Sequence, residues 1–99
     1  MSIENKQADY DRAITMPDHL DTTTSPEMKE HLSEIISSAD KITLDFSDTR
    51  LVSSAGLRVL LQAQKNVEKS AKSMKFINVS AEVMEVFDMT GVTKIFDIV

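Results

Sequence analysis

The fold of this 99-residue chain is indicated most strongly by one stretch, Leu51-Val52-Ser53-Ser54-Ala55-Gly56-Leu57-Arg58-Val59-Leu60-Leu61. It follows the apolar run 42–46 and opens an amphipathic segment, and this order predicts a strand, a short loop and the start of a helix. The first turn of a helix offers unpaired backbone N–H groups and the positive end of the helix dipole. A serine hydroxyl placed there can cap the helix, act as a nucleophile or accept a phosphate. The functional question is which of these roles the two serines have.

Helical and strand-like patterns alternate outward from this stretch. The expected elements are, in chain order, a strand around Ile3, a turn at 8–11, a strand at 12–16, a helix that Ser25 caps and Pro26 opens, a strand at 41–46, a helix at 55–70, a strand at 74–77 and a helix that Ser80 caps and Gly91 ends. The final apolar segment, 95–99, is compatible with a strand or a helix. Single strands that alternate with helices imply parallel crossovers in one sheet. The sequence therefore predicts an α/β fold with a four- to five-stranded mixed sheet and helices packed mainly on one face.

Length and composition indicate one domain over residues 1–99, with enough chain for a single core. The net charge of −5 argues against nucleic acid, because phosphate binding depends on clustered lysine and arginine. No apolar run approaches the roughly 20 residues that span a bilayer, so no membrane insertion is expected. The absence of cysteine and of a signal-peptide pattern favours a cytoplasmic location. Two glycines in all exclude a glycine-rich nucleotide loop, and no cofactor is expected.

Catalysis and metal binding are both disfavoured by the side chains available. The two histidines, His19 and His31, belong to no recognisable catalytic arrangement, and the nucleophile-elbow pattern of hydrolases is absent, so no enzyme is expected. Asp21, Asp45 and Asp48 could form an acidic cluster around the serines. A metal site needs ligands in a defined geometry, so helix capping and surface charge are the favoured roles of these aspartates and no metal is expected.

Gly56 and the two serines fit a contact surface better than a catalytic one. Glycine in a helix costs about 1 kcal/mol relative to alanine, so Gly56 predicts that a neighbouring strand or a partner comes close to the backbone. A phosphoserine at a helix start adds about −1.5 to −2 charge beside the favourable end of the dipole. The fold should therefore tolerate the modification, while a docked partner would have to desolvate a doubly charged group.

Four stretches together resemble the sequence signature of STAS domains, the family of the anti-sigma factor antagonists and related transporter tails. They are 42–61, the loop His19-Leu20-Asp21-Thr22, the stretch 76–83 and the ending 87–96. In that family an apolar strand that ends at an aspartate, here Asp45, leads to a Ser-Ser/Ala/Thr-Gly-Leu turn that opens a helix. The resemblance extends over about residues 12–98 and implies the STAS fold and a role in bacterial transcription regulation.

The resemblance also implies a mechanism and a site. By position, Ser54 is the residue that a cognate serine kinase phosphorylates, and this kinase doubles as the anti-sigma factor. The unphosphorylated antagonist binds the kinase and frees the sigma factor, and a serine phosphatase of the metal-dependent type restores it. The implied partner-binding residues are Asp21, Thr22, Ser53, Ser54, Ala55, Gly56, Leu57 and Arg58. Ser53 stands where the best-known phosphorylated members often have aspartate, so Ser53 is the second candidate for the phosphate.

A second function is compatible with the same fold. The chain could be a constitutive subunit of a transport complex, for example the small STAS partner of a lipid-transport ATPase. The same turn would then dock on the complex with no phosphate chemistry. The two hypotheses differ in what they require of Ser54, which is essential to the switch and an ordinary contact residue in the subunit.

Overall fold

Strands and helices alternate along residues 11–99, the part of the chain that the computed structural model describes. The elements are, in chain order, β1 (Asp11–Thr15), β2 (His19–Leu20), α2 (Ser25–Ser38), β3 (Lys41–Asp45), β4 (Leu51–Val52), α3 (Ser54–Lys69), β5 (Ser73–Ile77), α4 (Ala81–Thr90), the 3-10 helix η1 (Val92–Lys94) and β6 (Asp97–Ile98). The strand expected around Ile3 and most of the turn expected at 8–11 lie outside the described residues. No helix within residues 11–99 combines the length and the apolar character that crossing a bilayer requires.

The main sheet has the strand order β1-β3-β5-β6, and every pair in it is parallel. Ile14, Leu44, Phe76 and Ile98 lie opposite one another across its four strands. β2 and β4 form a second, two-stranded parallel sheet. The predicted α/β architecture is confirmed, but a mixed sheet was wrong for the described strands. The chain crosses over through α2, α3 or α4 between neighbours, and such a crossover brings the next strand back parallel.

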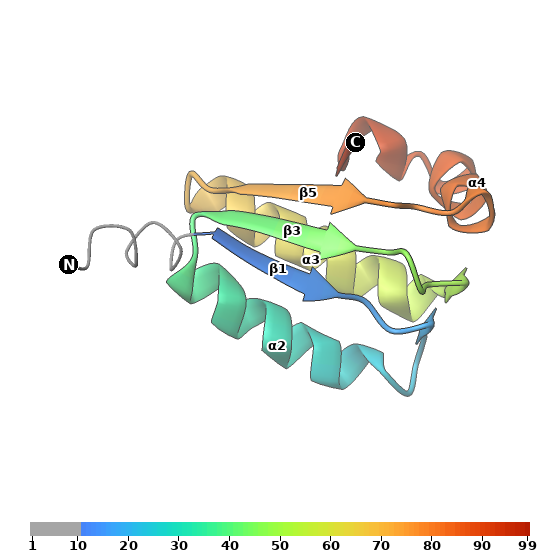
Figure 1. The fold of residues 1–99 in the computed structure, drawn as a ribbon, viewed down its shortest axis with the longest axis horizontal. Coiled ribbons are helices and arrows are strands. Elements are labelled where there is room, and N and C mark those ends of the chain that lie inside the picture. Colours follow the sequence, from blue (N-terminus) through green and yellow to red (C-terminus); the bar gives the residue numbers. More distant parts are fainter. Residues whose placement is uncertain (1–10) are drawn as a thin grey trace.

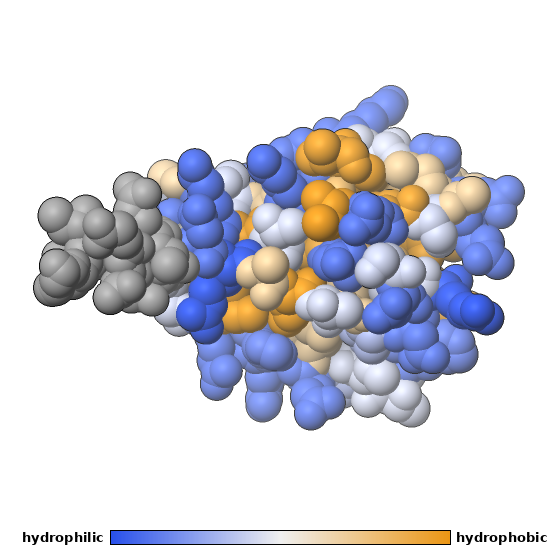
Figure 2. Space-filling view, viewed as in Figure 1, coloured by the Kyte–Doolittle hydropathy of each residue, from blue (hydrophilic) through white to orange (hydrophobic). Residues whose placement is uncertain are grey.

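The helices lie mainly on one face of the main sheet, as the sequence predicts. In Figure 1, α3 runs behind β3 and β5, α2 runs beside α3 below β1, and α4 lies past the carboxyl end of β5. The buried side chains between these layers are Ile14, Leu32, Ile35, Ile36, Ile42, Leu44, Leu60, Ala63, Val67, Met74 and Phe76. Ala13 and Lys75 point from the other face and are exposed. Figure 2 shows that open face as a mixture of hydrophilic and hydrophobic side chains.

The four phenylalanines of the chain join α4 and the C-terminal segment to the sheet. Phe76 of β5 stacks on Phe46 and Phe96, with ring centroids 5.4 and 4.3 Å apart. Phe87 of α4 meets all three rings edge-on, at 5.5 to 6.1 Å. Such aromatic pairs contribute about 0.5–1.5 kcal/mol each beyond the burial of their area. The cluster places the end of the chain against β5, where the segment 95–99 completes the sheet as β6.

The residues at the ends of α2 and α4 can be compared with the caps that the sequence predicts. Ser80 caps α4 by accepting a backbone N–H three residues on, at 3.2 Å, and Gly91 ends the helix with a φ of 81°, so both predictions are confirmed. The prediction that Ser25 is a cap was wrong. Thr24 is the cap residue of α2, but its hydroxyl makes no bond to the helix: the oxygen accepts the Asp21 N–H at 3.0 Å, and the hydroxyl donates to the His19 carbonyl at 2.8 Å.

Candidate functional site

The predicted site lies at the carboxyl end of the parallel strands. There the β2–β4 sheet and the first turns of α2 and α3 come together (Figure 1). The Arg50 N–H donates to the Asp18 carbonyl at 2.7 Å, and the Thr49 hydroxyl donates to the Pro17 carbonyl at 2.7 Å. These bonds hold the loop that follows β1 against the loop that leads into β4, and the turn with both serines follows β4 directly.

Gly56 is the position where the two segments come closest. Leu20 of β2 accepts a backbone hydrogen bond from the Ser53 N–H at 3.0 Å. A Cβ atom at Gly56 would lie 2.4 Å from the Leu20 carbonyl oxygen and 2.9 Å from its Cγ. The close approach that the glycine predicts is therefore made by a strand of the same chain. Gly56 is itself buried, and its role is to let β2 pack on the start of α3.

The two serines have different surroundings. The Ser53 hydroxyl oxygen accepts the Gly56 N–H at 3.3 Å and caps α3. Ser54 is the first residue of the helix and is exposed, and its hydroxyl makes no hydrogen bond with another described residue. Of the three roles that a serine can have at a helix start, capping belongs to Ser53, and the Ser54 hydroxyl is left accessible.

The loop before α2 is organised by Asp21. One oxygen of its carboxylate accepts the Thr23 hydroxyl at 2.7 Å and the N–H groups of Thr23 and Thr24 at 3.0 and 3.3 Å. These hydrogen bonds, the one from the Thr23 hydroxyl foremost, lower the pKa of the Asp21 carboxyl from its ordinary value. Asp21 is half-buried and Thr22 is exposed, so Thr22 contributes more free surface to this loop.

Asp45, another aspartate of the predicted acidic cluster, makes its hydrogen bonds away from Asp21. Asp45 accepts the Asn78 side-chain amide at 3.1 Å and the Ser47 N–H at 2.9 Å. The Asn78 amide is the main reason that the pKa of the Asp45 carboxyl is lowered, and the bonds from Ser47 add to it. Within residues 11–99, no three histidine, aspartate or glutamate side chains come close enough to hold a metal ion. Asp21 stabilises the loop before α2, and Asp45 joins the end of β3 to Asn78, which follows β5.

The first turn of α3 completes the predicted surface. Ala55 is half-buried, Leu57 is 8% exposed and Arg58 is fully on the outside of the helix. The free side-chain atoms of the predicted residues therefore come mainly from Thr22, Ser54 and Arg58.

The same turn differs in charge from the first turns of the other two α-helices in residues 11–99, α2 and α4. α2 has Glu27 in its first turn and α4 has Glu82, whereas α3 has no acidic residue there. A carboxylate in the first turn compensates the positive end of the helix dipole. At the start of α3, no carboxylate compensates the positive end of the helix dipole. This turn can therefore accommodate an anionic group beside the exposed Ser54 hydroxyl.

The family of the chain follows from comparison with known proteins. A model of the STAS domain matches residues 2–99. The chain belongs to the STAS domain family. The STAS fold that the sequence resemblance implies is thereby confirmed.

Proteins that this STAS domain is similar to include anti-sigma factor antagonists and, in fold, a transporter family protein. The anti-sigma-B factor antagonist of Bacillus subtilis is 26% identical over 98 residues, which cover 99% of this chain and 90% of that protein. The anti-sigma factor antagonist SpoIIAA in its unphosphorylated form has a TM-score of 0.77 at 19% identity, over 91% of this chain and 81% of that one. SpoIIAA in the phosphorylated form, from Bacillus, has a TM-score of 0.69 at 19% identity, over 88% and 80%. A sulfate transporter family protein from Wolinella succinogenes has a TM-score of 0.71 at 15% identity, over 86% and 70%.

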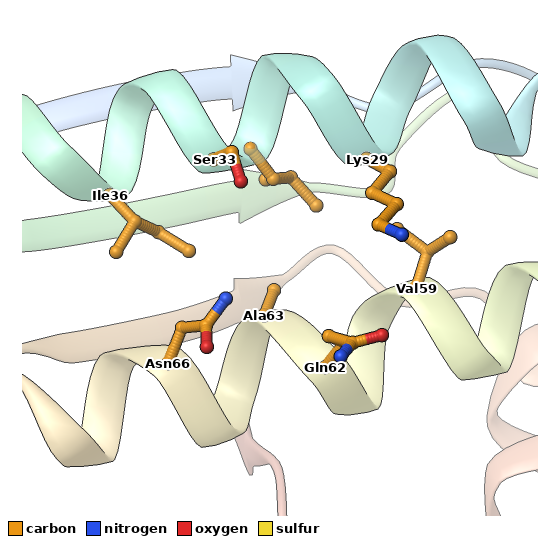
Figure 3. A pocket seen from close by; sticks show the side chains of 8 residues that line it. Lys29, Ser33, Ile36, Val59, Gln62, Ala63 and Asn66 are labelled. Carbon is orange, nitrogen blue, oxygen red and sulfur yellow. The ribbon is translucent and has the colours of Figure 1, made fainter.

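Beside the site, a narrow groove separates α2 from α3 of the STAS domain. Figure 3 shows Lys29 and Ser33 of α2 on one side of it and Gln62 and Asn66 of α3 on the other. Its volume is about 100 Å³, below the roughly 300–1,000 Å³ of sites that enclose small molecules. No carboxylate or histidine lines the groove. It is the contact line between two packed helices.

Proposed function

We propose that this STAS domain is an anti-sigma factor antagonist whose activity is switched by phosphorylation of Ser54. The observation that carries the proposal is that Ser53 caps α3 through the Gly56 N–H, while Ser54 is exposed with a free hydroxyl. A kinase can therefore modify Ser54 without breaking the cap. A phosphate on Ser53 would instead be attached to the hydroxyl oxygen that accepts the Gly56 N–H and caps the helix.

The phosphorylated domain keeps its fold in this proposal. A phosphate on Ser54 brings about −1.5 to −2 charge to the uncompensated first turn of α3, where the helix dipole favours negative charge. Arg58 lies four residues further along the helix, so its guanidinium is on the same side of the helix and one turn away. Both effects favour the modified helix start, so the modification acts on the partner and not on the fold.

The partner in this proposal is an anti-sigma factor serine kinase. The unphosphorylated domain binds it through the loop 18–24 and the turn 53–58 and thereby frees the sigma factor, and the domain itself catalyses no reaction. A doubly charged phosphate at the centre of this surface must be desolvated on docking. A cost of about 3–4 kcal/mol lowers the affinity roughly 100- to 1,000-fold. A serine phosphatase of the metal-dependent type restores the binding form.

Two findings support this assignment. The Bacillus subtilis relative that matches nearly the whole chain is an anti-sigma-B factor antagonist. SpoIIAA, whose fold this domain shares, exists in a phosphorylated and an unphosphorylated form.

The modification is tested by incubating the purified domain with the anti-sigma kinase of its host and ATP. Intact-mass measurement should show a gain of about 80 Da, the mass of one phosphoryl group, which Ser54→Ala abolishes. Ser53→Asn is the matched control, because asparagine is as good a cap as serine and cannot be phosphorylated in the same way. Ser53→Asn should gain the phosphate at the wild-type rate. Loss of the gain in Ser53→Asn and its retention in Ser54→Ala would assign the phosphate to Ser53.

The alternative is a constitutive subunit of a transport complex such as a lipid-transport ATPase, and the likeness to a sulfate transporter family protein favours it. The two functions are separated by binding measurements on Ser54 variants. For the switch, Ser54→Ala stays bound to the kinase in the presence of ATP, and Ser54→Asp binds poorly. Absence of phosphate from the wild-type domain after treatment with every serine kinase of the host would favour the constitutive subunit.

A further inference from the structure

A shallow hollow runs along the outer side of α3, starting at Ser54. Its volume is about 360 Å³. The residues that line it all belong to α3 and are Ser54, Leu57, Arg58, Leu61, Gln62 and Lys65. Their spacing places them on one side of the helix, over three turns. We call these six residues the α3 stripe.

The α3 stripe combines an apolar floor with positive charge. Leu57 is nearly buried and Leu61 is half-buried, so part of each side chain remains open to the hollow. Arg58 and Lys65 are exposed on either side of Leu61 along the helix axis. No acidic residue lines the hollow. Glu68, one turn further on, accepts a hydrogen bond from the Gln64 side chain at 3.0 Å instead.

This positive charge stands out against the rest of an acidic domain, whose net charge is −5. The helix α4 carries three acidic residues and no basic one, and α2 carries three glutamates and a single lysine. In contrast, α3 carries three basic residues and one glutamate. A partner that is attracted by α3 is repelled by α2, which packs beside α3, and by α4, so charge favours docking on α3.

We propose that the α3 stripe docks an acidic amphipathic helix of the anti-sigma partner. Arg58 and Lys65 are seven residues apart, which is about 10 Å along the helix. A partner helix with two carboxylates two turns apart matches this distance. An aliphatic or aromatic side chain between the carboxylates then packs on Leu61. This arrangement follows the general mode in which an amphipathic helix lays its apolar side into a groove.

The inference rests on the proposed function in one respect, which is that the docked protein is an anti-sigma kinase. It extends that function because it places the main attraction along three turns of α3 and not only at the phosphorylated turn. It also assigns Arg58 a double role. The guanidinium pairs with a carboxylate of the partner in the unmodified domain and with the Ser54 phosphate in the modified one, so the phosphate competes for the same cation.

The test measures binding of the purified anti-sigma kinase, without ATP, to charge-reversal variants of the full chain. Arg58→Glu and Lys65→Glu should each lower the affinity about tenfold or more, because each turns an attraction into a repulsion. Lys69→Glu is the matched control, since it makes the same change on the same helix outside the stripe, and its effect should stay within about threefold. Thermal unfolding of each variant, whose changed side chains are exposed, checks that the fold is unaltered.

A compensating change gives the sharper result. In the kinase, an acidic residue replaced by lysine should restore binding to Arg58→Glu while weakening binding to the wild-type domain. Equal affinity of wild type, Arg58→Glu and Lys65→Glu would overturn the inference, even if phosphorylation of Ser54 still releases the kinase. Weakened binding of both variants together with an unphosphorylatable wild-type domain would keep the docking surface and overturn the switch. Stripe-dependent binding to a transport ATPase and not to the kinase would overturn the assigned partner.

Discussion

The starts of α3 and α4 have the same kind of serine cap but differ in the residues that follow it. Ser53 and Ser80 each accept the N–H of the residue three positions on, at 3.3 and 3.2 Å. In α4 the next residues are an alanine, a glutamate and a buried valine, so the helix start is complete in itself. In α3 they are an exposed serine, an alanine and a glycine pressed against Leu20.

The start of α4 has only structural contacts, whereas the start of α3 leaves the Ser54 hydroxyl exposed. At α4, Glu82 supplies the negative charge that the dipole favours, and Val83 fills the core. At α3 the negative charge is absent and the core position is occupied by the backbone of β2, which Gly56 admits. The start of α3 is therefore tightly packed against Leu20 of β2 at its inner side and exposed to solvent at its outer side. In the proposed switch, a phosphate on this outer side acts on the partner without unfolding the domain.

The largest difference between the two starts should appear when the inner side of α3 is changed. Gly56→Ala places a Cβ 2.4 Å from the Leu20 carbonyl oxygen and should lower the free energy of unfolding by about 2–3 kcal/mol, as overpacking does. Urea denaturation measures it. The neighbouring Ala55→Gly, which only loses helix propensity, should cost about 1 kcal/mol. A Gly56→Ala domain that gains stability would show that β2 does not hold this position.

The two serine caps should contribute equally to the free energy of unfolding. Ser53→Ala and Ser80→Ala should each lower the free energy of unfolding by about 1 kcal/mol, because each leaves one N–H of the first turn without its acceptor. Ser53→Asn should restore nearly all of the loss. If Ser53→Ala leaves the free energy of unfolding unchanged while Ser80→Ala lowers it, another group caps α3. Ser53 would then again be a candidate for the phosphate.

Charge in the first turn should distinguish the two helices by a smaller amount. Ser54→Asp should raise the free energy of unfolding by about 0.3–1 kcal/mol at low ionic strength, because the first turn of α3 lacks a carboxylate. Ala81→Asp, at the matching position of α4, should gain less, since Glu82 is already there. Thermal unfolding in low and high salt measures both. Destabilisation by Ser54→Asp would mean that the fold itself resists a phosphate at this turn.

The smallest effect concerns pH. The pKa of the Asp21 carboxyl is lowered in the folded domain, so the stability that its bonds to Thr23 and Thr24 contribute is present above the unfolded pKa of about 3.9 and is lost as the pH falls through the lower folded pKa. Asp21→Asn keeps an acceptor oxygen and removes the titration. Thermal midpoints from pH 6 to pH 2 should therefore fall less for the variant than for wild type. Parallel curves would show that this carboxylate adds nothing to acid sensitivity.

Local patterns in the sequence were sufficient for much of the fold. The boundaries of β3, β5 and α3 agree with the predictions to within one residue, because the apolar periodicity and the caps of these segments are local signals. The cap residue of α2 was predicted one position too late, because the Thr24 hydroxyl is bonded within the preceding loop, to the Asp21 N–H and the His19 carbonyl, and not to the helix. The strand β2 has only two residues and no periodicity, and it exists through its pairing with β4.

For the candidate site too, some features followed from the sequence and others only from the tertiary structure. The sequence by itself determined that two serines stand at a helix start and that a glycine there predicts a close approach, since both follow from residue type and position. Only the tertiary structure decided that β2 makes this approach, that Ser53 caps the helix and Ser54 is free, and that Asp21 and Asp45 bond to different partners. Each of these depends on contacts between residues or on the direction of one hydroxyl, and neither is encoded in a local pattern. The helix start that indicated the fold is thus also the place where the tertiary structure engages one serine as a cap and leaves the other exposed.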